Sequence, residues 1–376
     1  MQKSKTKMSS IQNGPTTANM ASQLYLYLST CSKAWFCIYL LFCVLMALTS
    51  PMLHVMVVGL FLCAISYFRL PPPDPSDAFK ILGCDPRNLD GTPSKTRGAL
   101  GLIAHRAACL DAPENSLEGV RLAKKNGAKC IEFDVQLTAD GQAVVFHDAE
   151  VDRVTNGSGD LSQMTLKQVR SLDLAAKHVL KEQFSPCRIP TLEEFVDECL
   201  KLDLKMIIDL KPLESTEKTA ELITDLYKQK PQLYTSAMTS SFHPNLLYAI
   251  RQKDSRICCS MAWRPHYFAY KNYSGVSKEM ARRFSSPFQH HLAILADYIG
   301  EWLYHEFMWY FLGLSAVLVI KDVLTAGYVQ KWRERGVRLI AWTVNNSLER
   351  VYLERVLHIT CMSDTMDEIG IENILK

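Results

Sequence analysis

The sequence predicts an α/β fold, a TIM-type (β/α)8 barrel preceded by an N-terminal membrane helix segment. Eight short runs rich in β-branched residues alternate with stretches of helical periodicity after residue 98, the pattern of a parallel sheet with crossover helices. The chain has 376 residues, enough for one barrel of about 250 residues and an appendage. An almost wholly apolar run over residues 35–68 precedes the barrel region.

Residues 1–34 form a polar, basic tail, because they carry four lysines and no acidic residue. The apolar run over 35–68 would measure about 50 Å as a straight helix, against a hydrocarbon core of roughly 30 Å. Thr49, Ser50 and Pro51 interrupt it near its middle. We therefore expect one kinked, tilted span or a short re-entrant hairpin. A cleaved signal peptide is disfavoured, since the apolar stretch is too long and starts too late.

The charges that flank the apolar run predict an integral membrane protein with a cytoplasmic N-terminus. Only Arg69 and Lys80 follow the run closely, whereas the tail before it is basic, and basic segments stay in the cytoplasm. A single span, which we favour, places the rest of the chain in the lumen or outside the cell, at the plasma membrane or an endomembrane. A hairpin would keep it cytoplasmic. With a single span, the sequons at Asn156, Asn272 and Asn345 are available for glycosylation.

Residues 69–97 predict an extended linker, because they are rich in proline, glycine and serine. The barrel domain is expected over residues 98–376. Its strands are expected near residues 100–105, 130–136, 205–210, 236–241, 256–261, 316–320, 337–343 and 359–363.

Capping signals support several of the helices between these strands. Ser116 precedes a helical pattern, Thr191 and Glu194 form a capping box, and Gly336 ends the pattern over 328–335. Residues 143–190 interrupt the alternation with an extra strand, a glycine-rich turn and a helix. We interpret them as an insertion after the second strand.

A second insertion is expected over residues 285–312, where the chain is apolar and aromatic. Asp297, Glu301 and His305 recur every four residues, which predicts an amphipathic helix with one polar face. Trp302, Tyr304, Trp309 and Tyr310 are residue types that settle at a bilayer interface. The helix could lie on the membrane and help lipid substrates to enter, pack against the barrel, or form a second span.

The overall composition excludes a nucleic-acid partner recognised through a basic patch. The 42 basic and 39 acidic residues are spread along the chain and leave a net charge of +3. The 12 cysteines show no Cys-x-x-Cys spacing, so they fit neither a compact disulfide scaffold nor a zinc site. Most are expected to be small core residues, with disulfides only if the domain is luminal.

Charged and histidine side chains lie at the ends of several predicted strands. The C-terminal ends of the strands of a barrel share one face, where active sites of this fold occur. Because side chains two apart on a strand point the same way, Glu132 converges with Asp134, and Asp209 with Lys211. The residues are His105 and Arg106 on the first strand, Glu132 and Asp134 on the second, His147 after the inserted strand, and Asp209 with Lys211 on the third.

These residue types predict a metal and phosphate site. An apolar barrel interior does not tolerate so many charges unless they bind a metal or an anion. Glu132, Asp134 and Asp209 offer oxygen ligands for a hard divalent cation, Mg²⁺ or Ca²⁺. Arg106 and Lys211 can hold a phosphate. Two histidines can supply a general base and a general acid near neutral pH.

The arrangement resembles the glycerophosphodiester phosphodiesterase family. The segments that carry the resemblance are His105–Arg106, Ala112–Ser116, Glu132–Val135, Asp140–Gly141, Val145–Asp148, Asp152–Thr155, Gly157–Gly159, Ile189–Glu194 and Ala341–Asn345. Together they cover about residues 98–370. The membrane segment and the aromatic insertion make the chain most similar to the membrane-anchored animal branch of the family, described as acting on glycerophosphoinositol.

The resemblance implies a TIM barrel that uses a divalent metal, Mg²⁺ in first place and Ca²⁺ as the alternative, to hydrolyse glycerophosphodiesters to sn-glycerol 3-phosphate and an alcohol. By position, His105 and His147 would be the acid and base. Glu132, Asp134 and Asp209 would bind the metal, Arg106 and Lys211 the phosphate, and Trp342 would line the pocket. The implied route has two steps through a cyclic phosphodiester. Two residues depart from the family pattern: Ala107 replaces a usual glycine, and Asp209 a usual glutamate.

Two other functions are compatible with the sequence. One is a lysophospholipase D that cleaves lysophospholipids or glycerophospho-N-acylethanolamines in the membrane to which the chain is anchored. The other, of a different class, is an inactive membrane scaffold that recruits a signalling protein. The intact His105 and His147 argue against the scaffold.

Overall fold

The structure, a computed structural model, describes residues 39–40, 42–44, 46, 51–88, 100–211, 215–273 and 280–366. It consists of two compact units, residues 1–68 and 69–376. The expected basic tail, and the first half of the expected membrane segment except for a few residues, lie outside the described residues. The compartment of the second unit and its glycosylation stay predictions.

The first unit contains one long described helix, α2 (Pro51–Phe68). It begins at the proline that interrupts the apolar run, and proline favours the first turn of a helix because its missing N–H needs no partner there. Within the described part of the chain, no helix combines the length and the apolar character that crossing a membrane requires.

In the described part of the second unit, eight parallel strands close into a barrel, which confirms the barrel part of the predicted fold class. The ring is closed by the first strand, which pairs with both the second and the last. In order around the barrel the strands are β1 (Ile103–Ala104), β2 (Cys130–Leu137), β4 (Lys205–Leu210), β5 (Ala237–Ser241), β6 (Cys259–Trp263), β7 (Ala316–Ile320), β8 (Arg338–Trp342) and β9 (Thr360–Ser363). Each lies close to an expected position, although β6 starts three residues later than expected.

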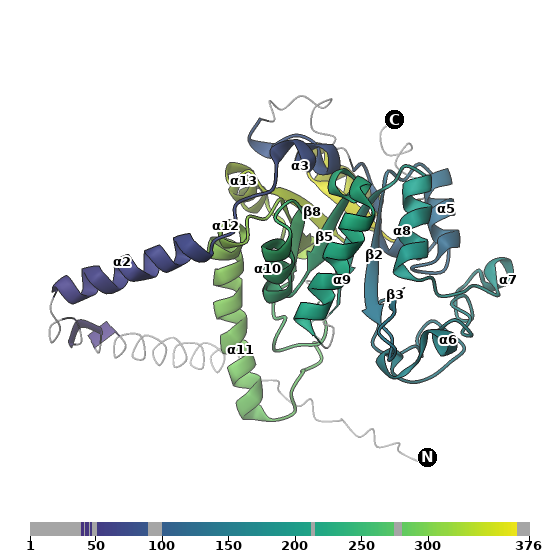
Figure 1. The fold of residues 1–376 in the computed structure, drawn as a ribbon, viewed down its shortest axis with the longest axis horizontal. Helices are drawn as coiled ribbons and strands as arrows, with labels where there is room; N and C mark the ends of the chain where they lie inside the picture. Colours follow the sequence, from purple (N-terminus) through teal and green to yellow (C-terminus); the bar gives the residue numbers. More distant parts are fainter. Residues whose placement is uncertain are drawn as a thin grey trace, which may run out of the picture. The chain divides into compact units, whose positions relative to one another are not determined.

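Helices surround the strands (Figure 1). The α-helices are α5 (Leu117–Lys125), α8 (Leu192–Lys201), α9 (Thr216–Gln229), α10 (Pro244–Lys253), α11 (Pro287–Trp302), α12 (Trp309–Phe311), α13 (Ala326–Glu334) and α14 (Ser347–Val351). The shorter 3-10 and π segments are η1 (Pro86–Asn88), η2 (His105–Ala107), η4 (Pro231–Thr235), η5 (Leu303–Met308), η6 (Lys321–Val323) and η7 (Tyr352–Val356). The expected caps are present: Ser116 accepts a hydrogen bond from the Gly119 amide, and Thr191 with Glu194 forms the capping box.

Alternation along the strands separates two apolar layers. Ile131 and Phe133 of β2 face the helices, where Phe133 packs on Phe195 of α8 with ring centroids 4.4 Å apart. Cys130 faces the barrel interior with Ile103 and other apolar residues near the N-terminal ends of the strands. By the same alternation, Glu132 and Asp134 also face the interior, and they lie nearer the C-terminal end of β2.

The excursion after β2 forms a small separate core. It contains β3 (Ala143–Val145), which pairs antiparallel with β2, and the short helices η3 (Leu161–Gln163), α6 (Leu166–Val169) and α7 (Lys181–Phe184). Phe146, Leu161 and Ile189 are buried in its centre. Because β3 is tied to β2, the residue that follows Phe146 is held at the rim of the barrel.

The expected extended linker contains a helix, α3 (Pro75–Leu82). Asp74 caps it by accepting a hydrogen bond from the Ser76 amide, and Ile81 and Leu82 are buried against the barrel's interior cluster, which includes Leu100 and Ile103. Proline content suggested an open linker, but Pro75 stands at the first helical position, where proline is favoured. Helix α3 lies at the end of the barrel opposite the excursion (Figure 1).

The polar face of α11, whose direction the sequence left open, is turned toward the protein. Asp297 and His305 of the expected polar face are buried, and Asp297 accepts hydrogen bonds from the Phe268 and Ala269 amides at 2.7 and 3.0 Å. Only Glu301 of that face is exposed. Of the four aromatic residues singled out, Trp302 and Tyr310 are exposed, Trp309 is half-buried and Tyr304 is buried.

Candidate active site

A pocket of about 340 Å³ lies at the C-terminal ends of the strands. Its volume is within the usual range for small-molecule sites. Its lining includes all eight residues that the sequence singled out: His105, Arg106, Glu132, Asp134, His147, Asp209, Lys211 and Trp342.

Three buried carboxylates form the centre of the site. Glu132 and Asp134 alternate along β2, and strand register places Asp209 of β4 beside Asp134. One oxygen from each lies within 4.8 Å of the others. Burial raises the pKa of Glu132, and the negative charges of Asp134 and Asp209 raise it further. The Oδ1 atom of Asp209 is buried without a hydrogen-bond partner among the described residues. A set of oxygen ligands, one of which lacks a hydrogen-bond partner, fits a hard divalent cation.

Lys211 and Arg106 partly neutralise this cluster. The Lys211 ammonium lies 2.6 Å from both Asp134 Oδ1 and Asp209 Oδ2. Burial lowers the pKa of Lys211, but attraction to the two aspartates outweighs this effect and raises it. The Arg106 backbone amide donates to Glu132 Oε2 at 2.9 Å, and its side-chain Nε lies 3.6 Å from Asp134. Burial raises the pKa of Asp134, yet Lys211, His147 and Arg106 together hold it well below its usual value.

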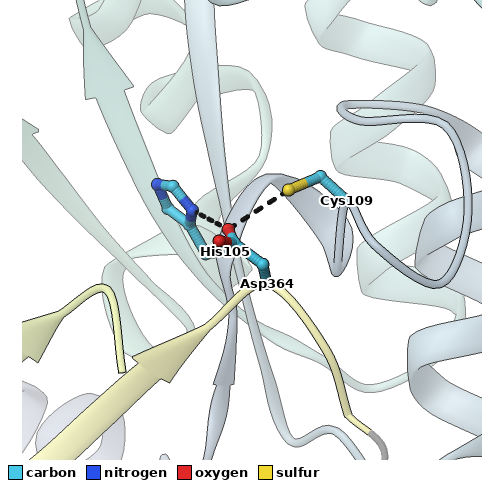
Figure 2. A group of neighbouring side chains, drawn as sticks. All are labelled: His105, Cys109 and Asp364. Carbon is cyan, nitrogen blue, oxygen red and sulfur yellow. Dashed lines mark hydrogen bonds and ion pairs between the residues drawn. The ribbon is translucent and has the colours of Figure 1, made fainter. Parts of the chain in front are cut away.

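His105 is held by a carboxylate that sequence reasoning missed. Its Nδ1 lies 2.5 Å from Asp364 Oδ1. Figure 2 shows this contact and the hydrogen bond that Cys109 donates to Asp364. Asn345 also donates to Asp364. Burial raises the pKa of Asp364, but the hydrogen bond from His105 and its positive charge hold it well below its usual value. An ionised carboxylate accepts hydrogen bonds only, so Nδ1 carries the proton and Nε2 faces the carboxylates, 3.9 Å from Glu132.

His147 is held in the same way. Its Nδ1 lies 2.5 Å from Asp148 Oδ1. Asp148 also accepts from Arg153, which in turn binds Glu114 through two hydrogen bonds of 2.7 and 2.9 Å. Burial raises the pKa of Asp148, but its hydrogen bonds from His147 and Arg153 hold it well below its usual value. In the sequence, Asp148 could be found as the residue after His147 in the family-like segment Val145–Asp148.

The backbone after His105 turns through an unusual conformation. Arg106, Ala107 and Ala108 have φ values of 47°, 62° and 62°, a left-handed region that costs a non-glycine residue roughly 1 kcal/mol or more. This explains the glycine that the family usually has at position 107. Gly119 of α5 leaves room for the Ala107 methyl group, since an added Cβ at position 119 would lie 3.1 Å from the Ala107 Cβ.

The rest of the pocket wall is aromatic and cationic. Tyr267 stacks on Phe242 with centroids 5.0 Å apart, and Phe242 meets Trp342 edge to face at 6.1 Å. The hydroxyl of Tyr267 lies 3.4 Å from His243 Nε2. Arg264, Lys271 and Arg283 also line this side. Of these residues only Trp342 was predicted. Arg264 was missed because the expected strand near 256–261 stopped short of Trp263, where β6 ends.

Comparison with known proteins agrees with this geometry. Residues 105–368 match the glycerophosphoryl diester phosphodiesterase family. The chain belongs to this family. It is 33% identical to glycerophosphodiester phosphodiesterase 1 of Homo sapiens over 330 residues, which cover 88% of this chain and 94% of that protein. The protein of the same name from Mus musculus is 34% identical over 330 residues, which again cover 88% of this chain and 94% of that protein.

Solved structures of glycerophosphodiester phosphodiesterases and related phosphodiesterases share the fold. A phosphodiesterase of Oleispira antarctica, solved in complex with the product sn-glycerol-3-phosphate, gives a TM-score of 0.57 at 23% identity, covering 73% of this chain and 96% of that one. A glycerophosphodiester phosphodiesterase of Agrobacterium tumefaciens gives 0.53 at 18% identity, covering 71% and 97%. The chain is therefore an enzyme of the glycerophosphodiester phosphodiesterase class. The family depends on a divalent metal, and the buried carboxylates are a fitting place for it.

The carboxylate that holds His105 predicts a pH-dependent contribution to stability. The pKa of Asp364 is depressed in the folded state, so its stabilisation is present above its unfolded pKa of roughly 3.9 and is lost as pH falls through the folded value. Asp364→Asn should lower the free energy of unfolding by about 1.5–3 kcal/mol at pH 7. Urea unfolding at a series of pH values should show the difference from wild type shrinking below about pH 4. A difference that stays constant from pH 7 to 3.5 would contradict this account.

Proposed function

We propose that this enzyme hydrolyses soluble glycerophosphodiesters of the glycerophosphoinositol type to sn-glycerol 3-phosphate and a free alcohol, with Mg²⁺ as its metal. One observation carries the proposal. Two histidines, each oriented by a carboxylate at Nδ1, line one pocket together with a buried three-carboxylate cluster. Such a pocket offers two proton-transfer groups around a place where a phosphate can bind.

In the proposed first step, the 2-hydroxyl of the glycerol attacks phosphorus and gives its proton to the Nε2 atom of one histidine. The bond from phosphorus to the head-group oxygen breaks, and the other histidine protonates that oxygen. The products are the free alcohol and a cyclic glycerophosphodiester. Asp364 and Asp148 stabilise each imidazolium as it forms, because their carboxylates already accept from Nδ1.

The second step opens the ring with the two histidines in exchanged roles. Water attacks phosphorus and gives its proton to the histidine left neutral, while the protonated histidine returns its proton to the glycerol 2-oxygen. Sn-glycerol 3-phosphate leaves. Arg106 and Lys211 orient the phosphate in both steps by charge-assisted hydrogen bonds. When bound at Glu132, Asp134 and Asp209, a divalent cation would neutralise phosphate charge and lower the pKa of the attacking hydroxyl.

The histidine assignment is tested with His105→Ala and His147→Ala. Each variant should lower kcat for release of sn-glycerol 3-phosphate from glycerophosphoinositol by about 10²–10⁴-fold, because one proton transfer loses its group. The matched control is His291→Ala, since His291 is exposed on α11 and does not line the pocket. Wild-type rates in either pocket variant would refute the assignment, and a wild-type enzyme inactive on this substrate would refute the substrate.

Metal binding by the carboxylates is tested by removal and titration. Dialysis against a chelator should abolish activity, and Mg²⁺ should restore it. Asp209→Asn should raise the Mg²⁺ concentration for half-maximal activity by about tenfold or more, because one charged oxygen ligand is lost. Mg²⁺ should also raise the Tm of wild type more than that of the variant, whereas Asp225→Asn, an exposed position on α9, should behave as wild type. Equal metal dependence in both variants would remove Asp209 from the metal site.

A second candidate, lysophospholipase D action at a membrane, is favoured by the outer face of α11. Its exposed apolar side chains follow helical spacing and form one stripe: Phe288, Leu292, Leu295, Ile299 and Trp302. The buried face of the same helix is joined through Asp297 to the loop that carries Tyr267 of the pocket wall. An apolar stripe with tryptophan at its end is suited to a bilayer interface.

We expect Leu292→Glu with Ile299→Glu to lower the ratio of activity on lysophosphatidylinositol in vesicles to activity on glycerophosphoinositol. Charges on this stripe oppose its contact with lipid. Gln289→Glu is the matched control, because it adds one charge at an exposed polar position of the same helix. No hydrolysis of the lysolipid by wild type, or an unchanged ratio in the double variant, would leave only the soluble substrate.

A further inference from the structure

The pocket carries a second group of charges, which the proposed mechanism does not use. Arg264, Lys271 and Arg283 line it together with the carboxylate cluster. Arg264 follows β6 and stands two residues after Ala262, which faces the barrel interior. Alternation therefore directs Arg264 into the same interior column at the C-terminal end of the barrel.

Arg264 is a buried cation with neutral partners only. It is 8% exposed, and its guanidinium donates to four backbone carbonyl oxygens, those of Pro265, His266, Tyr270 and Lys271, at 2.9–3.4 Å. Carbonyl dipoles satisfy its hydrogen bonds but carry no net charge, and the Asp297 carboxylate attracts it without forming an ion pair.

Arg283 brings a second cation without an ion pair to the same place. It donates to the Tyr267 and Tyr270 carbonyl oxygens at 3.0 and 3.3 Å. The guanidinium carbons of Arg264 and Arg283 lie 5.3 and 5.6 Å from the centre of the Tyr267 ring. Burial lowers the pKa of Arg264, and the like charge of Arg283 lowers it further. Among the residues that the structure describes, none of the three cations forms an ion pair with a carboxylate.

The cations on the other side of the pocket differ in this respect. Arg106 and Lys211 each lie within ion-pair distance of carboxylates. Tyr267 is influenced by both charge groups: burial raises its pKa, and the positive charges of Arg283, Arg264 and Lys211 oppose the rise. One part of the pocket lining thus holds cations paired with carboxylates, and another part holds cations without an ion pair.

We propose that Arg264, Lys271 and Arg283 form a second anion subsite, which binds a phosphate monoester on the head-group alcohol of the glycerophosphodiester. The inference rests on the proposed function and names its substrate class. The reacting diester carries one negative charge and its glycerol half none, so a second anion must belong to the head group. A phosphate monoester carries about −1.5 to −2 charges at neutral pH, which matches three cations better than a carboxylate does, and forked guanidinium donors suit its oxygens.

Holding the loop over residues 264–271 in shape would explain the hydrogen bonds of Arg264 and Arg283. It does not explain the exposed Lys271, nor why three cations line one pocket. Two long cations beside a buried third one repel each other unless an anion joins them. The subsite explains all three.

The test compares two substrates that differ by one phosphate, glycerophosphoinositol and glycerophosphoinositol 4-phosphate, with the full-length chain and Mg²⁺. Release of sn-glycerol 3-phosphate gives kcat/KM for each. We expect the wild-type ratio to favour the phosphorylated substrate. Arg283→Gln with Lys271→Gln should lower that ratio at least about tenfold through KM, and Arg283→Lys should retain most of it because the charge stays. Arg282→Gln is the matched control, since Arg282 is the exposed neighbour outside the pocket lining.

Each outcome decides the matter. A ratio that falls in the double variant and stays in Arg282→Gln supports the subsite. An unchanged ratio overturns it, and so does an equal loss on both substrates, which would assign these cations to the reacting phosphate. Higher salt should lower the wild-type ratio, because the cations are partly exposed to solvent. If wild type cleaves neither substrate, the proposed function has failed and the subsite falls with it; if it cleaves glycerophosphoinositol with no such ratio change, only the subsite has failed.

Discussion

The burial of three carboxylates at one end of the barrel is the constraint on which the rest of the site depends. Like charges that approach within 4.8 Å in a buried place are strongly unfavourable unless cations and hydrogen-bond donors compensate them. Lys211 bridges two of the carboxylates, the Arg106 amide donates to the third, and Asn115 donates to Asp134 at 2.9 Å. One oxygen of Asp209 is left without a donor. The protein compensates most of the charge and leaves the remainder for a cation.

The same constraint shapes the chain around His105. The left-handed turn over residues 106–108 directs the Arg106 amide at Glu132, so backbone strain is offset by a hydrogen bond to a buried charge. Asn115, also left-handed with φ of 57°, is placed beside Asp134. Farther from the carboxylate cluster, Arg153 forms ion pairs with both Glu114 and Asp148, and Asp148 contacts His147. The histidines are thus held by the outermost members of a network whose centre is the carboxylate cluster.

Sequence reasoning could find the carboxylate cluster of this network but not the carboxylate that orients His105. Alternation on a strand is strictly local, so Glu132 with Asp134, and Asp209 with Lys211, were recognisable as convergent pairs. Asp364 lies 259 residues from His105, and only closure of the ring between β9 and β1 brings them together. The position of β6 was off by a few residues, which hid Arg264 as a strand-end residue. Helix α3 was not predicted, because proline is common both in linkers and at the first position of a helix.

The orientation of α11 was open for a different physical reason, and it shows what helical periodicity can and cannot establish. A stripe at helical spacing shows that a helix has two unlike faces, but not which face meets the protein. Burial favoured the polar face here because the loop after β6 has two amides, of Phe268 and Ala269, that need an acceptor, and Asp297 supplies both oxygens. His305 likewise bonds Tyr328 and packs edge to face on Trp263. Once these hydrogen bonds turn the polar stripe inward, the apolar stripe must face outward. The same loop, fixed by Asp297 on its outer side and by Arg264 on its inner side, connects the exposed apolar surface of α11 to the cationic wall of the pocket.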